Sequence, residues 1–369
     1  MRILAIETSC DETAIAILEC DGGLANPQFK VLAEEVSSQI ETHRPFGGVV
    51  PNLAKREHIQ NLPIVYNQII QKFKILNLKF EIDLIAVTVG PGLEPCLWTG
   101  INFAENLAKE LNKPLIGVNH LEGHIYSNWL KPIRGILNLK FKILNSSRTI
   151  AFPAIVLLVS GGHTMLILMT SLTPPAGGWK VLGETKDDAV GEAFDKVAKM
   201  LKLPYPGGPE VEKLAAQNPK SNIQNPINFP RPMIHEKNYD FSFSGLKTSV
   251  LYYLRDNEEI LRSAQDDSLK AVVCSAFQEA AIDVLVTKTM RAAEEFDAKT
   301  ILLCGGVASN KFLQKNLLEK IQNLKSKIQM LVPPDKYNGD NAVMIAAAAY
   351  INHLQNKSHK IEANGNLGL

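Results

Sequence analysis

Two histidines four residues apart are the clearest candidates for chemistry in this sequence. His120 and His124 follow an apolar run at residues 114–118 that predicts a short buried strand, so the pair is expected to begin a helix where that strand ends. Residues four apart lie on one helix face, and two imidazoles so placed can share one divalent metal ion. The alternative is that both rings only make hydrogen bonds.

The residues between the two histidines argue against a zinc protease. That motif needs Glu directly after the first His, whereas Leu121 follows here and Glu122 comes third. Asp340 is a candidate third ligand, because an oxygen ligand beside two imidazoles makes an open facial site with room for substrate. The alternative is that Asp340 only caps the N-terminus of the Ala-rich helix that follows it.

Length and charge limit the possible classes of protein. A chain of 369 residues is too long for one ordinary core, so two domains are expected. The net charge of +1 provides no overall basic field, and a nucleic-acid partner must therefore be met by a local patch. Lys55, Arg56 and His58 form one small basic patch, for which the alternative is ordinary solvated surface.

The location of the protein is expected to be cytoplasmic. Five scattered cysteines, an odd number, indicate reduced thiols rather than a disulfide scaffold. The apolar start is interrupted at Glu7, too early for a signal peptide. The longest apolar run, residues 342–351, would cross roughly half a bilayer, so no membrane partner is expected.

Both halves of the sequence show the same order of elements. Each half has a strand, a polar turn and a returning strand, and later a buried strand that runs into a Gly turn and a helix. These patterns occupy residues 2–18 and 83–111 in the first half, and residues 154–169 and 300–317 in the second. The sequence therefore predicts an α/β protein of two similar lobes, whose glycines let backbone amides approach a nucleotide.

The predicted domain boundaries follow from these patterns. We expect an N-terminal lobe over residues 1–130 and a C-terminal lobe over residues 153–340, joined by an insert or linker at 131–152. A helix around residues 340–352 can pack back on the first lobe, and a second insert lies at 254–268. The alternating residues 240–247 predict a strand, and the polar residues 353–369 predict a disordered tail.

Several segments together resemble one family, the tRNA N6-adenosine threonylcarbamoyltransferases, formerly described as sialoglycoproteases. The matching motifs are residues 6–13, 47–51, 119–124, 158–164, 191–196, 205–209, 241–248 and 305–308, with Asn310, Asp340 and Asn341. They run in the family's order from residue 3 to about residue 351, which makes a chance likeness implausible. The sequence departs from the family pattern at Asn52, at residues 94–96 and at residues 338–339.

The resemblance implies a two-lobed actin/Hsp70/sugar-kinase-like ATPase fold with a nucleotide cleft. It implies transfer of a threonylcarbamoyl group from threonylcarbamoyl-AMP to N6 of the adenosine next to the anticodon, in tRNAs that read codons beginning with A. His120, His124 and Asp340 would hold one metal ion, iron as first choice and zinc as second. The adenylate, or ATP, would be surrounded by Leu158, Val159, Ser160, Gly161, Gly162, Asp195, Gly208, Glu212 and Asn310.

The remaining roles follow from the same resemblance and its chemistry. Asp11 or Glu12, at the tip of the first hairpin, is the expected base for the amine proton, and His163 is expected to orient substrate. The basic patch of Lys55, Arg56 and His58 would contact tRNA phosphates. Bacterial relatives work with a catalytically silent paralogue and a small ATPase, and a separate synthetase supplies the adenylate.

Three other functions remain open on the sequence alone. A small-molecule kinase or ATP-dependent carbamoyltransferase could use the same fold, although a magnesium-dependent kinase does not require the histidine pair. A nucleotide-gated scaffold would bind ATP without transferring a group. A metalloprotease ranks third because of the histidine spacing.

Overall fold

The structure is a computed structural model, and it describes residues 1–75, 80–130, 150–173, 178–218, 227–257, 267–324 and 327–369. Most of the two predicted inserts therefore lies outside the described residues. The chain divides into two compact units. Unit 1 comprises Met1–Ile150, Leu172–Gly177 and Pro333–Leu369, and unit 2 comprises Ala151–Ser171 and Gly178–Val332.

Unit 1 is built on a mixed five-stranded sheet in the order β3-β2-β1-β4-β5. Its strands are β1 (Arg2–Glu7), β2 (Glu12–Asp21), β3 (Gln28–Ser38), β4 (Leu84–Gly90) and β5 (Leu115–Asn119). β1 pairs antiparallel with β2 and parallel with β4, and β4 pairs parallel with β5. β4 is buried along its whole length, as expected for an apolar central strand covered on both faces.

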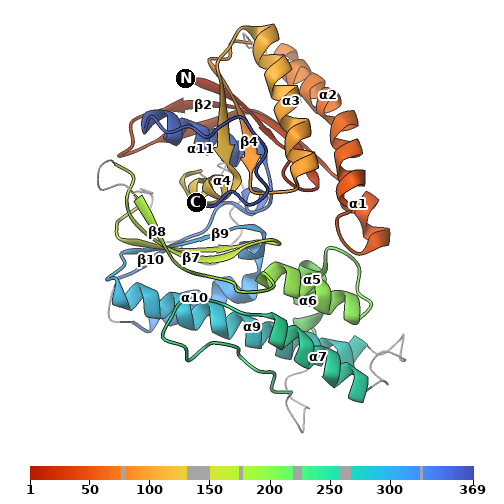
Figure 1. Ribbon diagram of the computed structural model, residues 1–369. Helices are drawn as coiled ribbons and strands as arrows, with labels where there is room; N and C mark the ends of the chain where they lie inside the picture. The colour runs from red at the N-terminus through yellow and green to blue at the C-terminus, as the bar shows by residue number, and fades with distance from the viewer. Residues whose placement is uncertain (76–79, 131–149, 174–177, 219–226, 258–266, 325–326) are drawn as a thin grey trace. The chain divides into compact units, whose positions relative to one another are not determined.

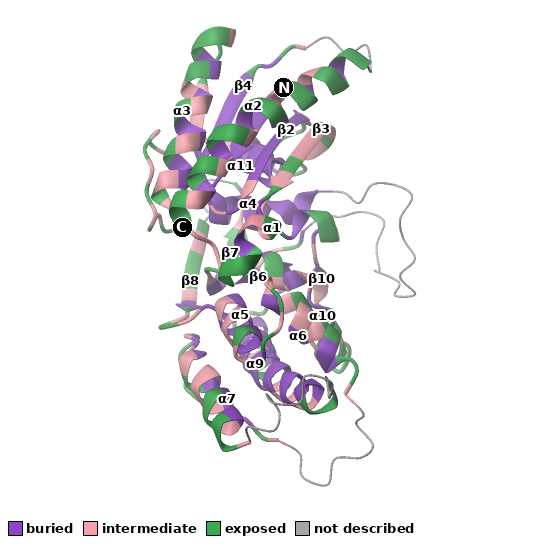
Figure 2. Cartoon of the chain, turned by 90° about the vertical axis from the view of Figure 1, so that its right-hand side faces the viewer, coloured by how far each residue is buried: buried purple, intermediate pink, exposed green. Residues whose placement is uncertain are grey.

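Helices cover this sheet, and one of them carries two of the three candidate metal ligands, His120 and His124. They are α1 (Ile40–His43), α2 (Pro51–Ile75), α3 (Glu94–Leu111), α4 (His120–Tyr126) and α11 (Ala342–Leu354), with 3-10 turns η1 (Arg44–Phe46), η2 (Ser127–Trp129) and η4 (Asp335–Tyr337). α2 packs on α3, β2 and β3, whereas α11 packs on β1, β2, β5 and α4. Figure 2 shows α11 and α4 as buried and α2 and α3 as partly exposed. α11 is therefore an internal support for the sheet and for α4.

The segment after α11 was expected to be disordered, but the structure places it against unit 1. Asn364 N donates to Val89 O at 2.9 Å, Asn119 Nδ2 donates to Gly368 O at 2.8 Å, and His359 forms an isolated bridge with Gly117. Leu367 packs against the apolar core. The physical reason is that β5 lies at the edge of the sheet, where unpaired backbone groups accept a covering segment.

Unit 2 repeats the topology of unit 1 in a second five-stranded sheet, ordered β10-β9-β6-β7-β8. Its strands are β6 (Ala154–Val159), β7 (Thr164–Ser171), β8 (Gly178–Glu184), β9 (Thr300–Cys304) and β10 (Gln329–Leu331). As in unit 1, the first strand pairs antiparallel with the second and parallel with the strand that follows the helices. The predicted α/β class with two similar halves is confirmed (Figure 1).

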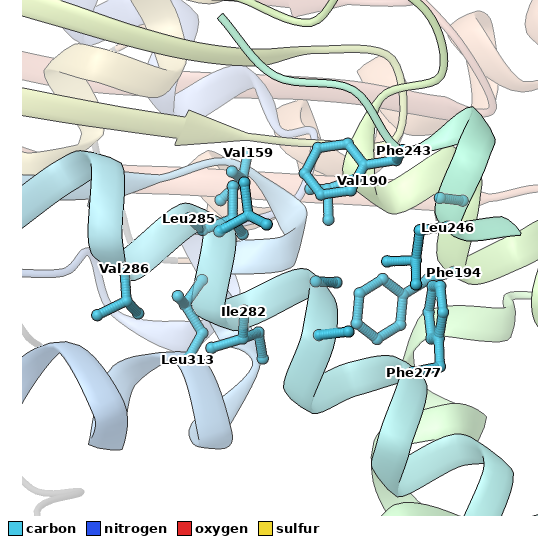
Figure 3. Close-up of a cluster of buried hydrophobic side chains, with 14 of the residues drawn as sticks. Val159, Val190, Phe194, Phe243, Leu246, Phe277, Ile282, Leu285, Val286 and Leu313 are labelled. Atoms are coloured by element: carbon cyan, nitrogen blue, oxygen red, sulfur yellow. The ribbon is translucent and has the colours of Figure 1, made fainter. Parts of the chain in front are cut away.

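The core of unit 2 lies between this sheet and its helices. The helices are α5 (Val190–Met200), α6 (Gly207–Ala215), α7 (Ser244–Asp256), α9 (Asp267–Glu295) and α10 (Lys311–Gln322), with η3 (Gly306–Ser309). Figure 3 shows Phe194 of α5 beside Phe277 of α9, and their rings meet edge to face at 4.9 Å. Within the described residues, none of the helices combines the length and apolar character needed to span a membrane.

The predicted strand at residues 240–247 is wrong for most of its length. Phe241 makes only an isolated bridge with Thr185, and α7 begins at Ser244. Phe241 and Phe243 are both fully buried and stack at 6.3 Å, so the alternation of Phe and Ser reflects a short extended segment that leads into a helix.

Candidate active site

The two histidines begin α4 as predicted, and the preceding residue fixes where the helix starts. The Asn119 side chain accepts a hydrogen bond from Leu121 N at 2.8 Å and so caps α4. His120 and His124 then lie one turn apart, with ring centroids separated by 4.7 Å. Gly123, between them, lets α11 approach, because a Cβ there would lie 2.9 Å from Ile345 Cδ1.

Asp340 is not the N-cap of α11. That role belongs to Asn341, whose side chain accepts from Met344 N at 2.9 Å. Asp340 Oδ1 instead lies 3.3 Å from His120 Nε2 and 3.2 Å from His124 Nε2. The three candidate ligand atoms lie within 4.8 Å of one another.

The surroundings of His124 test whether these residues fit a metal ion. Its side chain is fully buried, and within the described residues its Nδ1 has no hydrogen-bond partner, while its Nε2 faces the Asp340 carboxylate at 3.2 Å. Leaving a buried polar group unsatisfied costs about 1–3 kcal/mol. A divalent ion between the imidazoles and Asp340 would satisfy His124, and two imidazoles with one carboxylate are a donor set that transition metals accept. The residues therefore fit the predicted metal.

Glu7, at the end of β1, orients His120 through the ring nitrogen that does not face Asp340. Its Oε2 lies 2.9 Å from His120 Nδ1 and accepts from Thr88 Oγ1 at 2.7 Å, while its Oε1 accepts from Ser9 N at 2.5 Å. A carboxylate that accepts the Nδ1 proton directs the other ring nitrogen to a metal. No role for Glu7 was predicted from the sequence, although a carboxylate at the end of an otherwise apolar central strand was a signal for one.

His120 and Asp340 form a charged pair in the metal-free protein. Burial alone would lower the pKa of His120, but the charges of Asp340 and Glu7 outweigh burial and raise this pKa well above its usual range. Burial would raise the pKa of Asp340, but the charge of His120 and the hydrogen bonds from both histidines lower it. A metal ion therefore has to displace a proton from His120 before it can bind there.

Metal binding is accordingly expected to depend on pH. Below the raised pKa of His120, we expect Zn²⁺ binding to release about one proton and the affinity to fall about tenfold for each unit by which the pH is lowered. Calorimetric titrations in buffers of different ionisation enthalpy measure the released proton directly. An affinity that did not change between about pH 6 and pH 8 would contradict a protonated, metal-free His120.

The tip of the β1–β2 hairpin places two further carboxylates in unit 1. Asp11 is buried, and Glu12 is partly exposed with Ser38 Oγ donating to its Oε1 at 3.4 Å. Burial, followed by the charges of Asp11 and Asp340, raises the pKa of Glu12 well above its usual range. Glu12 is therefore a stronger base than a solvated glutamate.

In unit 2, several of the predicted substrate-binding residues lie on the β6–β7 turn and on the helices α5, α6 and α10. Asp195 Oδ1 accepts from Gly207 N at 2.7 Å and from Gly208 N at 3.3 Å, so it is not the solvated carboxylate that its pattern suggests in isolation. Asn310 caps α10 by accepting from Leu313 N at 2.8 Å. Glu212 Oε1 accepts from the neighbouring Lys311 N at 2.6 Å.

Two glycines allow backbone segments to pack against the β6–β7 turn. A Cβ at Gly191 would lie 2.5 Å from Ser160 O, and a Cβ at Gly305 would lie 2.3 Å from Val159 O. Gly161 and Gly162 are exposed, and a Cβ on either would meet nothing within 4 Å. The turn therefore presents open backbone amides, which suit an anion.

Comparison with known proteins identifies the family. A family model described as tRNA N6-adenosine threonylcarbamoyltransferase matches residues 30–347. Curated proteins of that name are 46% identical in Thermosipho africanus, over 95% of this chain and 94% of the relative, and 45% identical in Thermosipho melanesiensis, over 100% of both. The chain belongs to this family. A Bacillus cereus threonylcarbamoyltransferase is 42% identical over 100% of this chain and 96% of its own length.

Solved structures support the predicted fold of this threonylcarbamoyltransferase. Full-length HypF in its phosphate- and nucleotide-bound form aligns with a TM-score of 0.55 at 13% identity, over 98% of this chain and 47% of HypF. HypF from T. kodakarensis aligns with a TM-score of 0.54 at 13% identity, over 96% and 47%. The chain thus spans about half the length of these proteins, and the likeness shows that it shares their fold.

Three of the residues predicted for the site, His58, Leu158 and Val159, are fully buried in the structure. His58 is fully buried, so it cannot belong to an exposed phosphate-binding patch, although Lys55 and Arg56 on the same turn of α2 are exposed. Leu158 and Val159 are fully buried strand residues, because both faces of β6 are covered. Ser160 and His163 are partly exposed in the turn, where His163 N donates to Ser160 Oγ at 3.0 Å.

Proposed function

We propose that this chain transfers the threonylcarbamoyl group of threonylcarbamoyl-AMP to N6 of the adenosine adjacent to the anticodon, in tRNAs that read codons beginning with A. Family membership over nearly the whole chain supports the reaction class. The observation that carries the site assignment is the set of His120, His124 and Asp340, whose ligand atoms lie within 4.8 Å of one another.

The residues of unit 1 suit an acyl transfer to a weak nucleophile. A bound divalent ion, iron as first choice and zinc as second, would supply Lewis acidity toward the threonylcarbamoyl oxygens. His120 and His124 are held rigidly for this purpose by α4, and Glu7 fixes the ring of His120. Such preorganisation removes the cost of arranging the ligands during the reaction.

The carboxylates at the hairpin tip would manage the proton. The tRNA amine attacks the carbamoyl carbon, the bond from that carbon to the phosphate oxygen breaks, and AMP leaves. The amine proton must pass to a nearby base, and Glu12 is suited to accept it because burial and the charge of Asp11 raise its pKa. Asp11 is the alternative base, since it lies beside Glu12 at the same tip.

Unit 2 would bind the adenylate. Gly161 and Gly162 offer exposed amides for the phosphate, and His163 lies at the end of the same turn. The nucleoside would contact the N-termini of the helices near Asp195, Gly208 and Asn310, and also Glu212. The proposed partners are tRNA, a catalytically silent paralogue and a small ATPase, with a separate synthetase supplying the adenylate.

A reconstituted reaction tests the proposed function. Purified chain, the partner subunits and tRNA are supplied with threonylcarbamoyl-AMP, and modified adenosine is measured by mass spectrometry. The matched control is the same tRNA with guanosine in place of the target adenosine, which removes the N6 amine. Product that requires the adenosine and needs no ATP in the transfer step supports acyl transfer. If no modified adenosine forms, a parallel reaction of the purified chain with ATP alone separates the alternatives: consumption of ATP would support a kinase, and binding of ATP without consumption would support a nucleotide-gated scaffold.

The exposed basic residues of α2 are proposed to contact tRNA phosphates. We expect Lys55→Ala and Arg56→Ala each to raise the KM for tRNA. Each should also make the slope of log K for tRNA binding against log salt concentration shallower by about one. Lys74→Ala is the control, because Lys74 is an exposed cation near the other end of α2. Unchanged salt dependence in both variants would exclude these two residues from the tRNA-binding surface.

A further inference from the structure

A chain of buried polar side chains lies behind the hairpin tip of unit 1. His43 and His58 are fully buried and Gln39 is nearly so, although none of them belongs to the proposed metal centre. They come from three consecutive segments: Gln39 precedes α1, His43 ends α1, and His58 lies on the buried face of α2. Buried polar groups must be hydrogen-bonded, and here the partners determine what each group can donate.

The first link fixes the tautomer of His43. The backbone N–H of Val50 can only donate, and it reaches His43 Nδ1 at 3.3 Å, so Nδ1 is the acceptor nitrogen. The proton of neutral His43 is then on Nε2, which lies 3.0 Å from Gln39 Oε1. The amide of Gln39 is therefore oriented with its oxygen toward His43.

The second link fixes the tautomer of His58 from both sides. Because the oxygen of Gln39 faces His43, its Nε2 faces His58 Nδ1 at 3.3 Å and can only donate to it. The Thr13 hydroxyl lies closer to the same nitrogen, at 2.7 Å, and can donate to it as well. On the other side of the ring, Cys10 O lies 2.9 Å from His58 Nε2 and can only accept. His58 is therefore neutral with its proton on Nε2, which agrees with the lowering of its pKa by burial.

The chain ends on the backbone of the hairpin tip. His58 Nε2 donates to Cys10 O at 2.9 Å, and Gln39 N donates to Asp11 O at 3.0 Å. On the other flank, Leu93 N donates to Ser9 O at 2.8 Å. Three successive carbonyls of the tip are thus held in place, and their orientation sets where the side chains of Asp11 and Glu12 point.

We propose that His58 is a positioning residue for the two tip carboxylates, and that Gln39 and His43 maintain the tautomer that this role requires. The inference rests on the proposed function, because it assumes that Asp11 or Glu12 accepts the amine proton. By this inference, His58 acts on the reaction by positioning the tip carboxylates, although its place in a basic run of the sequence suggests a contact with tRNA.

Kinetics of two His58 variants test this role. His58→Leu removes the donor to Cys10 O, and we expect kcat to fall by roughly 10–100-fold with little change in the KM for tRNA or in Zn²⁺ affinity. His58→Gln keeps an N–H donor and is expected to recover most of the loss. Unchanged kcat in His58→Leu, a loss confined to the KM for tRNA, or failure of His58→Gln to restore the rate in a folded protein would overturn the proposal.

A spectroscopic measurement tests the same proposal without activity. The ¹⁵N spectrum of histidine-labelled protein should show His58 as the neutral Nε2–H tautomer. Gln39→Glu has nearly the same shape but places a carboxylate in place of the amide donor to Nδ1. Because the Thr13 hydroxyl beside the same nitrogen can accept as well as donate, we expect this charge to drive His58 toward the doubly protonated form. An Nδ1–H tautomer in the wild type, or a spectrum unaltered by Gln39→Glu, would refute the deduced chain, even if His58→Leu did not fold.

The proposed function and this inference can fail separately. Asp11→Asn and Glu12→Gln measured in the same assay report on the carboxylates themselves. If both keep the wild-type rate, the assignment of the proton acceptor fails. If either loses activity while folded His58→Leu does not, only the positioning role of His58 is excluded. His235→Ala removes an exposed histidine of unit 2 and is the control for the effect of replacing a histidine anywhere in the protein.

Discussion

His120→Ala is expected to abolish both metal binding and threonylcarbamoyl transfer. The variant removes one of the three candidate ligand atoms and leaves Asp340 without the charge that stabilises its carboxylate. Loss of Lewis-acid assistance worth about 4 kcal/mol corresponds to roughly a 10³-fold decrease in rate. Zn²⁺ titration and the mass-spectrometric assay of modified adenosine measure the two effects on the same preparation.

Glu7→Gln provides a graded comparison for His120→Ala. The amide keeps the shape of Glu7 but removes the negative charge that faces His120 Nδ1 at 2.9 Å. Replacing such an orienting carboxylate typically costs 10–100-fold in metal affinity or activity, so we expect roughly that loss here. Product formation by His120→Ala at the wild-type rate would refute the metal assignment, whatever Glu7→Gln does.

Glu122→Ala is expected to have the largest effect on stability. Glu122 is fully buried and accepts from Asn352 Nδ2 at 2.6 Å, forms an ion pair with Lys357, and lies 3.4 Å from His359 Nε2. Removing one partner of a buried ion pair typically lowers the free energy of unfolding by about 3–5 kcal/mol. We expect a loss of about 3 kcal/mol here, because Lys357 remains partly in water. Denaturant unfolding measures the loss, and faster trypsin cleavage after Lys357 would show release of the final segment.

The pH dependence of this effect has a definite sign. Burial would raise the pKa of Glu122, but hydrogen bonds from His359 and Asn352 and the charge of Lys357 lower it. The stabilisation is therefore fully present above the unfolded pKa of about 4.3 and is lost as the pH falls through the lower folded pKa. Glu19→Ala is the control, because this carboxylate pairs with Arg2 and Lys30 at the surface and should contribute much less to stability. Equal losses for Glu122→Ala and Glu19→Ala would contradict the buried anchor.

Elements with strong patterns were predictable from the sequence, and edge elements were not. The buried strands β4 and β9 and the hairpin β1–β2 have continuous apolar runs ended by polar or Gly turns. β3 was missed because it lies at the edge of its sheet and is only partly buried, so its residues do not alternate clearly. The start of α7 was missed because Phe241 and Phe243 alternate with serines just before it.

The candidate ligands were predictable, but much of their support was not. His120 and His124 were found from helical spacing and Asp340 from the family pattern, since those signals are local. The partners of Glu7 lie far along the chain at Thr88 and His120, so its role required the folded structure. His58 was misplaced because a polar residue in a basic run looks exposed, although helical geometry turns it inward.

The order of translation determines when the metal centre can form. A nascent chain that has just produced α4 already contains Glu7 and both imidazoles, but the Asp340 carboxylate and the Asn352 that binds Glu122 are made much later. Until then, the growing polypeptide offers only an incomplete set of ligands. If the proposed ion is bound, only a finished chain can take it up, so metallation would be a maturation step after protein synthesis rather than part of it.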